Sequence, residues 1–389
     1  MDLKILSLGS LCTGCCACMN VCKQGAIQML ENEEGFFYPN VDFDICIECQ
    51  QCILVCPECN DGVVDGDLIQ IAYYGWHNDD QIRKLSSSGG AFSALAEIVL
   101  ENNGVIFGSA HNYKQHKVMH QSSEDVNWAA LRKSKYVQSY IGNSFQRIKK
   151  FLKDGRFVLF VGTPCQVSGL RFYLQKGNES LLTCDFICHG VPSMKILNDH
   201  LSYLEKREKS KITNVDFRPK LLGWSQYMLF CSFKNGSNYK KIHSVEPYLN
   251  GFLNNYTLRT SCYSCNYSAH QHHADFTLAD FWGYRRYNPK INDEKGLSLI
   301  LINTEKGKRF IEKLDKKRVT LHPIEWKYAE YVFKEHTAQN YGIDKRNIFF
   351  KDYVEIGYEK AVQKHGLGGT LKSSFKFLAK SMVKALLAK

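Results

Sequence analysis

Residues 156–188 read "RFVLFVGTPCQVSGLRFYLQKGNESLLTCDFIC". Two strongly apolar runs, residues 156–162 and 181–188, flank a segment over residues 166–175 that has the length of a helix. A strand, a helix and a second strand in this order predict one unit of a parallel α/β sheet. Cys165 and Cys188 then both lie at the carboxyl ends of adjacent strands, which is where open α/β sheets bind ligands.

The same alternation continues on both sides of this unit. We expect a helix over residues 91–102, a strand over 105–110 and a helix over 144–154. Residues 226–243 predict a β-hairpin that turns at an Asn-Gly pair. The sequence therefore predicts an α/β domain with a mainly parallel sheet and appended antiparallel strands.

Two cysteine runs precede this domain. Residues 12–22 read "CTGCCACMNVC" and residues 46–57 read "CIECQQCILVCP", which is the bacterial ferredoxin spacing twice over. In that pattern three close cysteines hold one 4Fe–4S cluster and the fourth reaches to the other. Two zinc knuckles are the alternative, but zinc prefers separated pairs of ligands. We assign Cys12, Cys15, Cys18 and Cys56 to the first cluster, and Cys46, Cys49, Cys52 and Cys22 to the second.

Three details qualify the ferredoxin pattern. Lys23 stands where the first run usually has proline, and we expect a local effect on the loop. Cys16 and Cys59 are surplus to the two clusters, and we interpret them as bystanders. The module is an α+β ferredoxin-like unit with two clusters.

The changes in pattern predict three parts. Residues 1–64 form the ferredoxin module, and residues 70–345 form the catalytic domain, with an N-terminal part at about 72–148 and a C-terminal part at 155–325. Residues 346–389 form a basic tail that we expect to be helical. Its last segment, residues 371–384, combines lysines at four-residue steps with an apolar stripe, so it either rests on an anionic membrane surface or docks on protein.

Composition places the chain among soluble redox or metal proteins. Hydrophobic residues make up 44% of the 389 residues, and no apolar run approaches the length of a membrane span. The N-terminus is a poor signal peptide, so we expect a cytoplasmic protein. A cytoplasmic protein in peripheral contact with the inner face of the membrane is the alternative. Sixteen cysteines in such a protein indicate metal binding or redox chemistry rather than disulfides.

Charge is divided unevenly along the chain. Residues 1–62 carry nine acidic and two basic side chains, which gives a net charge of −7. Since the whole chain has a net charge of +11, the remaining residues carry +18. A basic body attracts the phosphates of a nucleotide cofactor, an acidic partner or anionic lipid. We expect no nucleic-acid binding, because neither a zinc finger nor a recognition helix is present.

Two further features outside the ferredoxin runs suggest ligand sites. Residues 86–90, "SSSGG", open a predicted helix beside Lys84 and form either an anion site or a well-capped helix start. Cys262 and Cys265 form a chelating pair. Together with Cys165 and Cys188 they complete a set of four thiols, which could hold a third iron–sulfur cluster or a structural zinc. The remaining alternative is a reactive thiol at Cys165.

Six motifs in order resemble the β-subunit family of coenzyme F420-reducing hydrogenases and dehydrogenases. They are "SSSGGAFSALA", "SKYVQS", "GTPCQVSGL", "CHGVPS", "CYSC" and "ADFTLADFWG", between about residues 72 and 325. The resemblance implies FAD and a 4Fe–4S cluster in the catalytic domain. It makes Cys165, Cys188, Cys262 and Cys265 the ligands of a third cluster. It also implies that the flavin is bound by Ser88, Gly89, Gly90, Lys135, Tyr136, Gln138 and Ser139.

Histidines and carboxylates near these motifs are further candidates. His189 follows Cys188 and is the candidate proton donor near the flavin. We interpret His270, His272 and His273 as a loop that faces solvent or covers a cofactor. Asp275 and Asp280 match acidic positions of the family motif. A structural role suits them at least as well as a catalytic one.

These expectations combine into an iron–sulfur flavoprotein oxidoreductase. Deazaflavin and nicotinamide coenzymes exchange two electrons as hydride, whereas iron–sulfur clusters pass one at a time, and FAD handles both. Its partners would be a redox protein or small reductant at the clusters, and a deazaflavin, nicotinamide or other reducible organic compound at the flavin. The alternative is a ferredoxin-like electron-transfer subunit that feeds a partner enzyme and has no substrate site.

Overall fold

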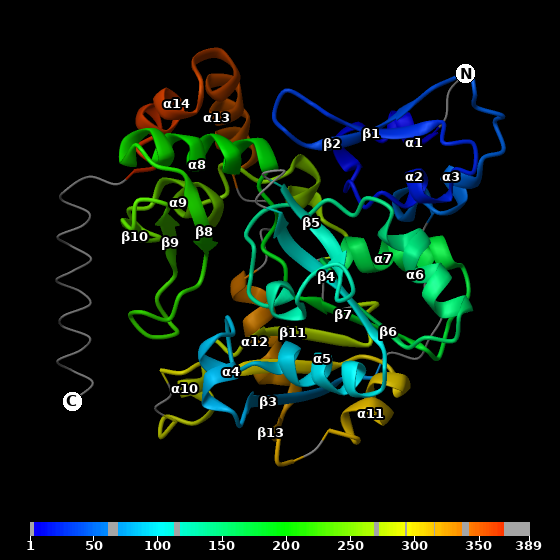
Figure 1. Cartoon of the computed structure of the whole chain (residues 1–389), viewed down its shortest axis with the longest axis vertical. Helices are drawn as coiled ribbons and strands as arrows, with labels where there is room; N and C mark the ends of the chain where they lie inside the picture. The colour runs from blue at the N-terminus through cyan, green and yellow to red at the C-terminus, as the bar shows by residue number, and fades with distance from the viewer. Residues whose placement is uncertain are drawn as a thin grey trace.

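The computed structural model describes residues 4–60, 69–112, 117–267, 272–291, 294–314, 316–336 and 342–368. Within these ranges an N-terminal module lies against a body built on an eight-stranded sheet, and a three-stranded sheet completes the molecule (Figure 1). None of the helices in these ranges combines the length and the apolar character needed to cross a bilayer. His270 and the amphipathic stripe predicted over 371–384 lie outside the described residues.

The N-terminal module is a hairpin flanked by two cysteine loops. Strands β1 (Ile27–Glu31) and β2 (Phe37–Val41) pair antiparallel. Its helical segments are all short: α1 (Lys4–Ser7), η1 (Gly9–Leu11), α2 (Ala17–Val21), α3 (Gln51–Leu54) and η2 (Pro57–Cys59). The module has the ferredoxin-like α+β arrangement expected from the sequence.

The large sheet has the strand order β13-β3-β12-β11-β7-β6-β4-β5. Its strands are β3 (Ile71–His77), β4 (Val105–Asn112), β5 (Lys117–Ser122), β6 (Val158–Val161), β7 (Leu181–Phe186), β11 (Phe276–Asp280), β12 (Ser298–Ile302) and β13 (Val319–Ile324). The predicted strand–helix–strand unit is confirmed, since β6 and β7 pair in parallel on either side of α7 (Pro164–Leu174).

The sheet as a whole is mixed, which corrects the expectation of a mainly parallel one. Only the four central strands, β11, β7, β6 and β4, run parallel to one another. The remaining neighbours pair antiparallel. β5 starts five residues after β4 ends, which is too short for the crossover that a parallel neighbour requires.

Helices cover both faces of the central strands. α5 (Ala91–Glu101) packs on one face, where its Leu95 and Val99 share a buried cluster with Ile106 and Leu159. α6 (Ser144–Lys153) and α7 cover the other face, whose strands contribute Phe107, Val158 and Phe160. This alternation explains why these strands are apolar along their whole length.

The three-stranded sheet confirms the predicted hairpin. β9 (Met228–Phe233) and β10 (Asn238–Ile242) pair antiparallel, and Gly236 between them has a φ of 85°. β8 (Ile212–Asp216) adds to β9, so this sheet is separate from the large one. α8 (Met194–Glu208) packs against it.

The C-terminal part of the described chain belongs to the body. α13 (Ile343–Ile356) and α14 (Tyr358–Lys364) share one buried cluster with α8. The predicted start of a tail at residue 346 therefore falls inside a packed helix. The remaining helical segments are α4 (Asp80–Lys84), η3 (Trp128–Leu131), α9 (Pro247–Leu253), η4 (Thr260–Ser264), α10 (Tyr284–Tyr287), α11 (Glu305–Ile311) and α12 (Trp326–His336).

Candidate functional site

The two cysteine loops of the module have the same backbone conformation. Gly14 and Glu48, each two residues after the first cysteine of its run, have φ values of 69° and 51°. Cys16 and Gln50, each directly after the second cysteine, have φ values of 63° and 58°. Because Cys16 occupies the position that Gln50 takes in the other loop, its thiol is not part of the repeated pattern.

The thiols predicted for the first cluster meet in one small cavity. Cys12, Cys15, Cys18 and Cys56 all line it. Burial, followed by the charges of Cys15, Cys16, Cys12 and Cys56, raises the pKa of Cys18 well above its usual value. Such a mutual influence indicates that these sulfur atoms lie close together.

The second predicted set lies nearer the surface. Cys52 is buried, and its pKa is raised by burial and by the nearby charges of Cys49 and Cys46. Cys22 and Cys46 pack with it in one apolar cluster. Cys49 is exposed. No three His, Cys, Asp or Glu side chains of the described residues are placed to hold a single metal ion.

The four thiols proposed for a third cluster also come together. Cys165 is the second residue of α7, Cys188 follows β7, and Cys262 and Cys265 lie within and directly after η4. All four line one cavity. Burial raises the pKa of Cys165 well above its usual value, and the charges of the other three thiols raise it further. As a free thiol Cys165 would stay protonated, which disfavours the reactive-nucleophile interpretation.

A cavity at the carboxyl ends of the central strands, called the large cavity below, receives most of the residues predicted for the flavin. Its volume is about 300 Å³. Its lining includes these residues from the prediction: Ser88, Gly90, Lys135, Tyr136, Ser139 and His189. Gln138 lines the neighbouring thiol cavity instead. Gly89 packs against the sheet, where a Cβ atom would lie 2.4 Å from the carbonyl oxygen of Gly75.

Basic side chains gather in one part of this cavity, although Lys133 is paired with Asp216. Arg132, Lys133 and Lys135 line it together with Ser87 and Ser88 at the entry to α5. Burial lowers the pKa of Lys135 to about 7. Sequence reasoning missed Arg132 and Lys133, because two basic residues in an unpatterned segment give no signal of their own.

Arg218 organises another part of the wall, and sequence reasoning missed it as well. Its guanidinium pairs with Asp280 at 2.9 Å and donates to the Tyr136 hydroxyl at 3.0 Å. The Trp224 indole also donates to Asp280. Asp280 and Tyr136 both line the cavity, so this buried network holds the cavity wall in place.

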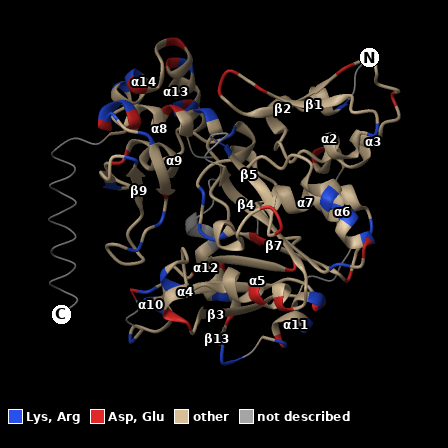
Figure 2. Cartoon of the chain, viewed as in Figure 1, with Lys and Arg blue, Asp and Glu red and all other residues tan. Residues whose placement is uncertain are grey.

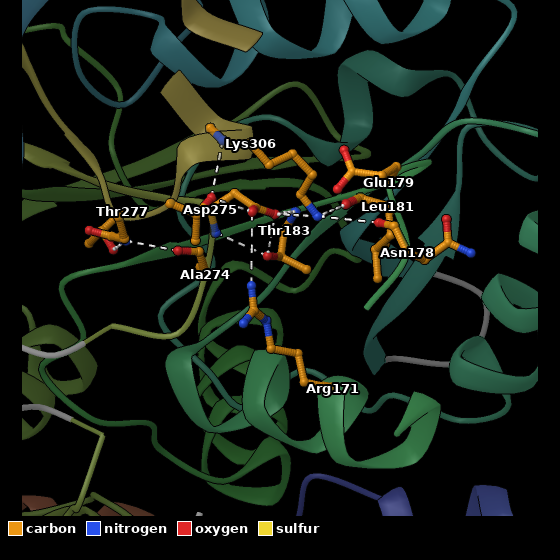
Figure 3. A network of polar contacts seen from close by, with 12 residues as sticks. Arg171, Asn178, Glu179, Leu181, Thr183, Ala274, Asp275, Thr277 and Lys306 are labelled. Carbon is orange, nitrogen blue, oxygen red and sulfur yellow. Dashed lines mark hydrogen bonds and ion pairs between the residues drawn. The ribbon is translucent and has the colours of Figure 1, made fainter. Parts of the chain in front are cut away.

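Asp275, the other acid of the family motif, is structural. Its carboxylate is buried and accepts hydrogen bonds from the Thr183 backbone and hydroxyl and from the Thr304 hydroxyl. Lys306 pairs with it at 3.3 Å, and Arg171 approaches from α7 (Figure 3). These contacts tie β7 to β11 away from the cavity.

The histidines fall into different surroundings. His189 lines both the large cavity and the thiol cavity, and its ring packs edge-on against Phe252. His272 is buried and pairs with Asp185, which lines the large cavity. Burial lowers the pKa of the neighbouring His273. His272 therefore covers the cavity from behind rather than facing solvent.

The three cavities form a row. Thr163, Gln166, Cys188 and His189 line both the large cavity and the thiol cavity. Thr13 lines both the thiol cavity and the cavity of the first cysteine set. Each cavity thus shares a wall with the next, from the large cavity to the module.

Arg259 holds the module against this row. It is 1% exposed, and it donates to the carbonyl oxygens of Cys12 and Phe37 at 2.8 and 3.0 Å. It also donates to Gln138, whose amide in turn donates to the Thr13 carbonyl at 3.0 Å. The module is therefore anchored through its own backbone.

Two glycines, one in the module and one in the body, permit the close approach of these two parts. A Cβ atom on Gly169 of α7 would lie 2.9 Å from the Cys15 sulfur, and one on Gly14 would lie 2.8 Å from the Gln138 amide. Side chains at either position would push the first cysteine loop away from the body.

Replacing Gly14 by alanine should destabilise the protein more than the same change at Gly25. Both glycines have a φ of 69°, so the backbone strain is matched, but nothing lies within 4 Å of a Cβ atom on Gly25. Overpacking costs about 1–3 kcal/mol. Urea unfolding of the two variants measures the difference, and equal losses would contradict the proposed close contact.

Two parts of the chain match known protein families. Residues 155–327 match the family described as the C terminus of the beta subunit of coenzyme F420 hydrogenase/dehydrogenase, and residues 11–60 match the 4Fe-4S dicluster domain. Residues 155–327 are thus similar to the C-terminal domain of this family and follow a 4Fe–4S dicluster match, which confirms the resemblance predicted from the motifs.

Similarity outside these two domain families is limited. No curated protein matches the chain. A solved chain of the F420-reducing [NiFe] hydrogenase complex from Methanosarcina barkeri aligns with a TM-score of 0.44 and 16% identity, over 78% of this chain and 94% of that one.

Proposed function

We propose that the chain is an iron–sulfur flavoprotein oxidoreductase with three 4Fe–4S clusters and one FAD. The row of cavities with shared walls carries this proposal. It gives electrons a continuous route between the module and a pocket large enough for an organic group. A bound flavin supplies the exchange between two-electron organic chemistry and one-electron cluster chemistry.

The residues of the large cavity fit a dinucleotide. Arg132 offers positive charge, Lys133 lies beside it in an ion pair with Asp216, and the Ser87 hydroxyl offers a donor at the entry to α5. This combination of positive charge, a hydroxyl and a helix N-terminus suits a diphosphate. Tyr136, Phe252 and Trp282 line the same cavity and supply apolar surface for rings.

The residues of the thiol cavity fit a cubane cluster. Four cysteines are the ligand set that a 4Fe–4S cluster requires, and Cys165, Cys188, Cys262 and Cys265 line one small cavity. Thr163 lies 3.1 Å from the Cys165 sulfur, so its hydroxyl can donate to that ligand. Hydrogen bonds to ligand sulfur tune the potential of a cluster.

The organic substrate would meet the flavin in the large cavity. We assign His189 as the candidate proton donor there, because it lies at the wall that the flavin and thiol cavities share. The substrate class is a deazaflavin, a nicotinamide or another reducible organic compound. Electrons enter or leave at the other end through the two clusters of the module.

The content of iron, zinc and flavin in anaerobically purified protein tests the proposal. We expect about twelve irons and one FAD per chain, since each cubane holds four irons. About eight irons and no flavin would support a simple electron carrier instead. Zinc in place of the third set of four irons would support a structural metal site.

A further inference from the structure

The outer end of the electron route reaches the molecular surface at the second cysteine loop. Cys15 and Cys56 of the first set are buried, whereas Cys49 of the second set is exposed and Cys46 is half-buried. The cysteines of the second set line none of the three cavities, and Cys52 shares an apolar cluster with Cys56 of the first set. A protein that exchanges electrons with the route therefore has its shortest approach at residues 42–54.

Residues 42–54 also expose large apolar side chains. Phe43 is 42% exposed, Ile45 47%, Ile47 64% and Leu54 54%. Single exposed apolar residues are ordinary, but four of them within thirteen residues around cluster ligands are unusual, and gathered exposed apolar side chains are typical of surfaces that bind other proteins. We call residues 42–54 the outer face.

The outer face is acidic as well as apolar. Asp42, Asp44 and Glu48 are exposed, and none forms an ion pair with a described residue. Residues 24–60 contain no Lys or Arg. Figure 2 shows the contrast between this module, with red segments and little blue, and the body, where basic residues are frequent.

We propose that the outer face is the docking site of a one-electron redox protein with basic side chains around an apolar contact. Acidic groups steer a cationic partner to the surface, and the apolar side chains then bury area beside the exposed Cys49. Electron-transfer complexes bury little surface and dissociate quickly. The few exposed apolar side chains of the outer face are therefore sufficient for such a contact.

This inference rests on the proposed function only in requiring the second cluster. It requires neither the flavin nor the third cluster. A further copy of this chain, whose body is basic, is the other conceivable occupant of an acidic face. The oligomeric state at low ionic strength decides between the two, because self-docking would produce a dimer.

The test uses cytochrome c, a basic haem protein, as the probe. The full chain is reduced anaerobically and mixed rapidly with oxidised cytochrome c, and the rate of haem reduction is followed at low and high ionic strength. We expect Asp44→Lys with Glu48→Lys to slow the reaction about tenfold or more at low ionic strength. Ile47→Ser should slow it at both ionic strengths, because it removes apolar contact area.

Matched controls carry the same changes elsewhere. Glu305→Lys with Glu312→Lys alters the charge equally at the two ends of α11, which lies at the opposite end of the molecule from the module (Figure 1). Ile348→Ser removes an isoleucine that is 56% exposed on α13. Neither control should change the rate by more than about twofold.

Three outcomes would overturn the inference. Outer-face variants that keep their iron but react as fast as the unaltered protein would exclude this docking site and leave the proposed function intact. Controls that slow the reaction equally would show only a general charge effect. A chain without iron would remove both the docking site and the proposed function.

Discussion

Replacing Cys165 by alanine is expected to lower the iron content from about twelve to about eight per chain. One cubane has four irons, and the loss of one of its four proposed ligands in the thiol cavity removes the support for that cluster. Electrons supplied to the module should then no longer reach the flavin. To measure this transfer, the protein is reduced anaerobically with a limiting amount of dithionite. The flavin absorbance is then read at the time when the module clusters are reduced.

The control for this experiment is Cys184→Ala. Cys184 lies in β7, is completely buried and lines none of the three cavities. The variant loses a buried sulfur without losing a proposed ligand, so its iron content should stay at that of the unaltered protein. An unchanged iron content in Cys165→Ala would contradict the third cluster, and zinc lost from Cys165→Ala would indicate a structural metal.

Replacing Arg259 by methionine is expected to be the most destabilising change outside the cysteines. The substitution removes buried donors from the Cys12 and Phe37 carbonyls and from Gln138. Hydrogen bonds from a charged group contribute about 1.5–3 kcal/mol each, so we expect a loss of about 3–5 kcal/mol after partial relaxation. The module should also separate from the body, which lengthens the path between the first cluster and the third.

Hydrogen exchange distinguishes undocking from general destabilisation. In Arg259→Met, exchange should rise most strongly in α2 and β2. The matched control is Arg83→Met, because Arg83 is also buried but donates to the Gly296 carbonyl, within the body. That variant should lose stability while α2 and β2 keep their protection, and a similar exchange pattern in both variants would contradict the anchoring role.

The cysteine spacing was sufficient to predict the module. Three thiols within seven residues can reach one cluster without help from the rest of the chain. The equal conformations at Gly14 and Glu48, and at Cys16 and Gln50, are the local consequence of that repeated spacing. The parallel strand–helix–strand unit was equally predictable, since it depends on an apolar pattern within one short segment.

The antiparallel strands of the large sheet could not be predicted in the same way. β3 lies between β12 and β13 in the sheet, although more than two hundred residues of the chain separate β3 from either of these strands. Nothing in the sequence of β3 specifies these neighbours, because an apolar strand can pair in either direction. The choice depends on which edges remain free once the central strands have formed.

The glycines and basic residues of the large cavity show the same limit. The motif "SSSGG" predicts an anion site, but only the packed structure shows that Gly89 faces the sheet and Gly90 the cavity. Arg132 and Arg259 lie just before the motifs SKYVQS and CYSC but are not part of them, and Arg218 lies in none of the motifs. Their roles come from contacts with residues that are distant in the sequence.

Local patterns in the chain were sufficient to predict the cysteine loops, the central α/β unit and the family resemblance, because each depends on short segments of sequence. The set of Cys165, Cys188, Cys262 and Cys265 was already predicted from spacing and resemblance, whereas the shared walls of the three cavities are visible only in the folded chain. The physical reason is that a shared wall is built by side chains from separate elements. Their approach is set by packing over the whole sheet, which no local pattern specifies.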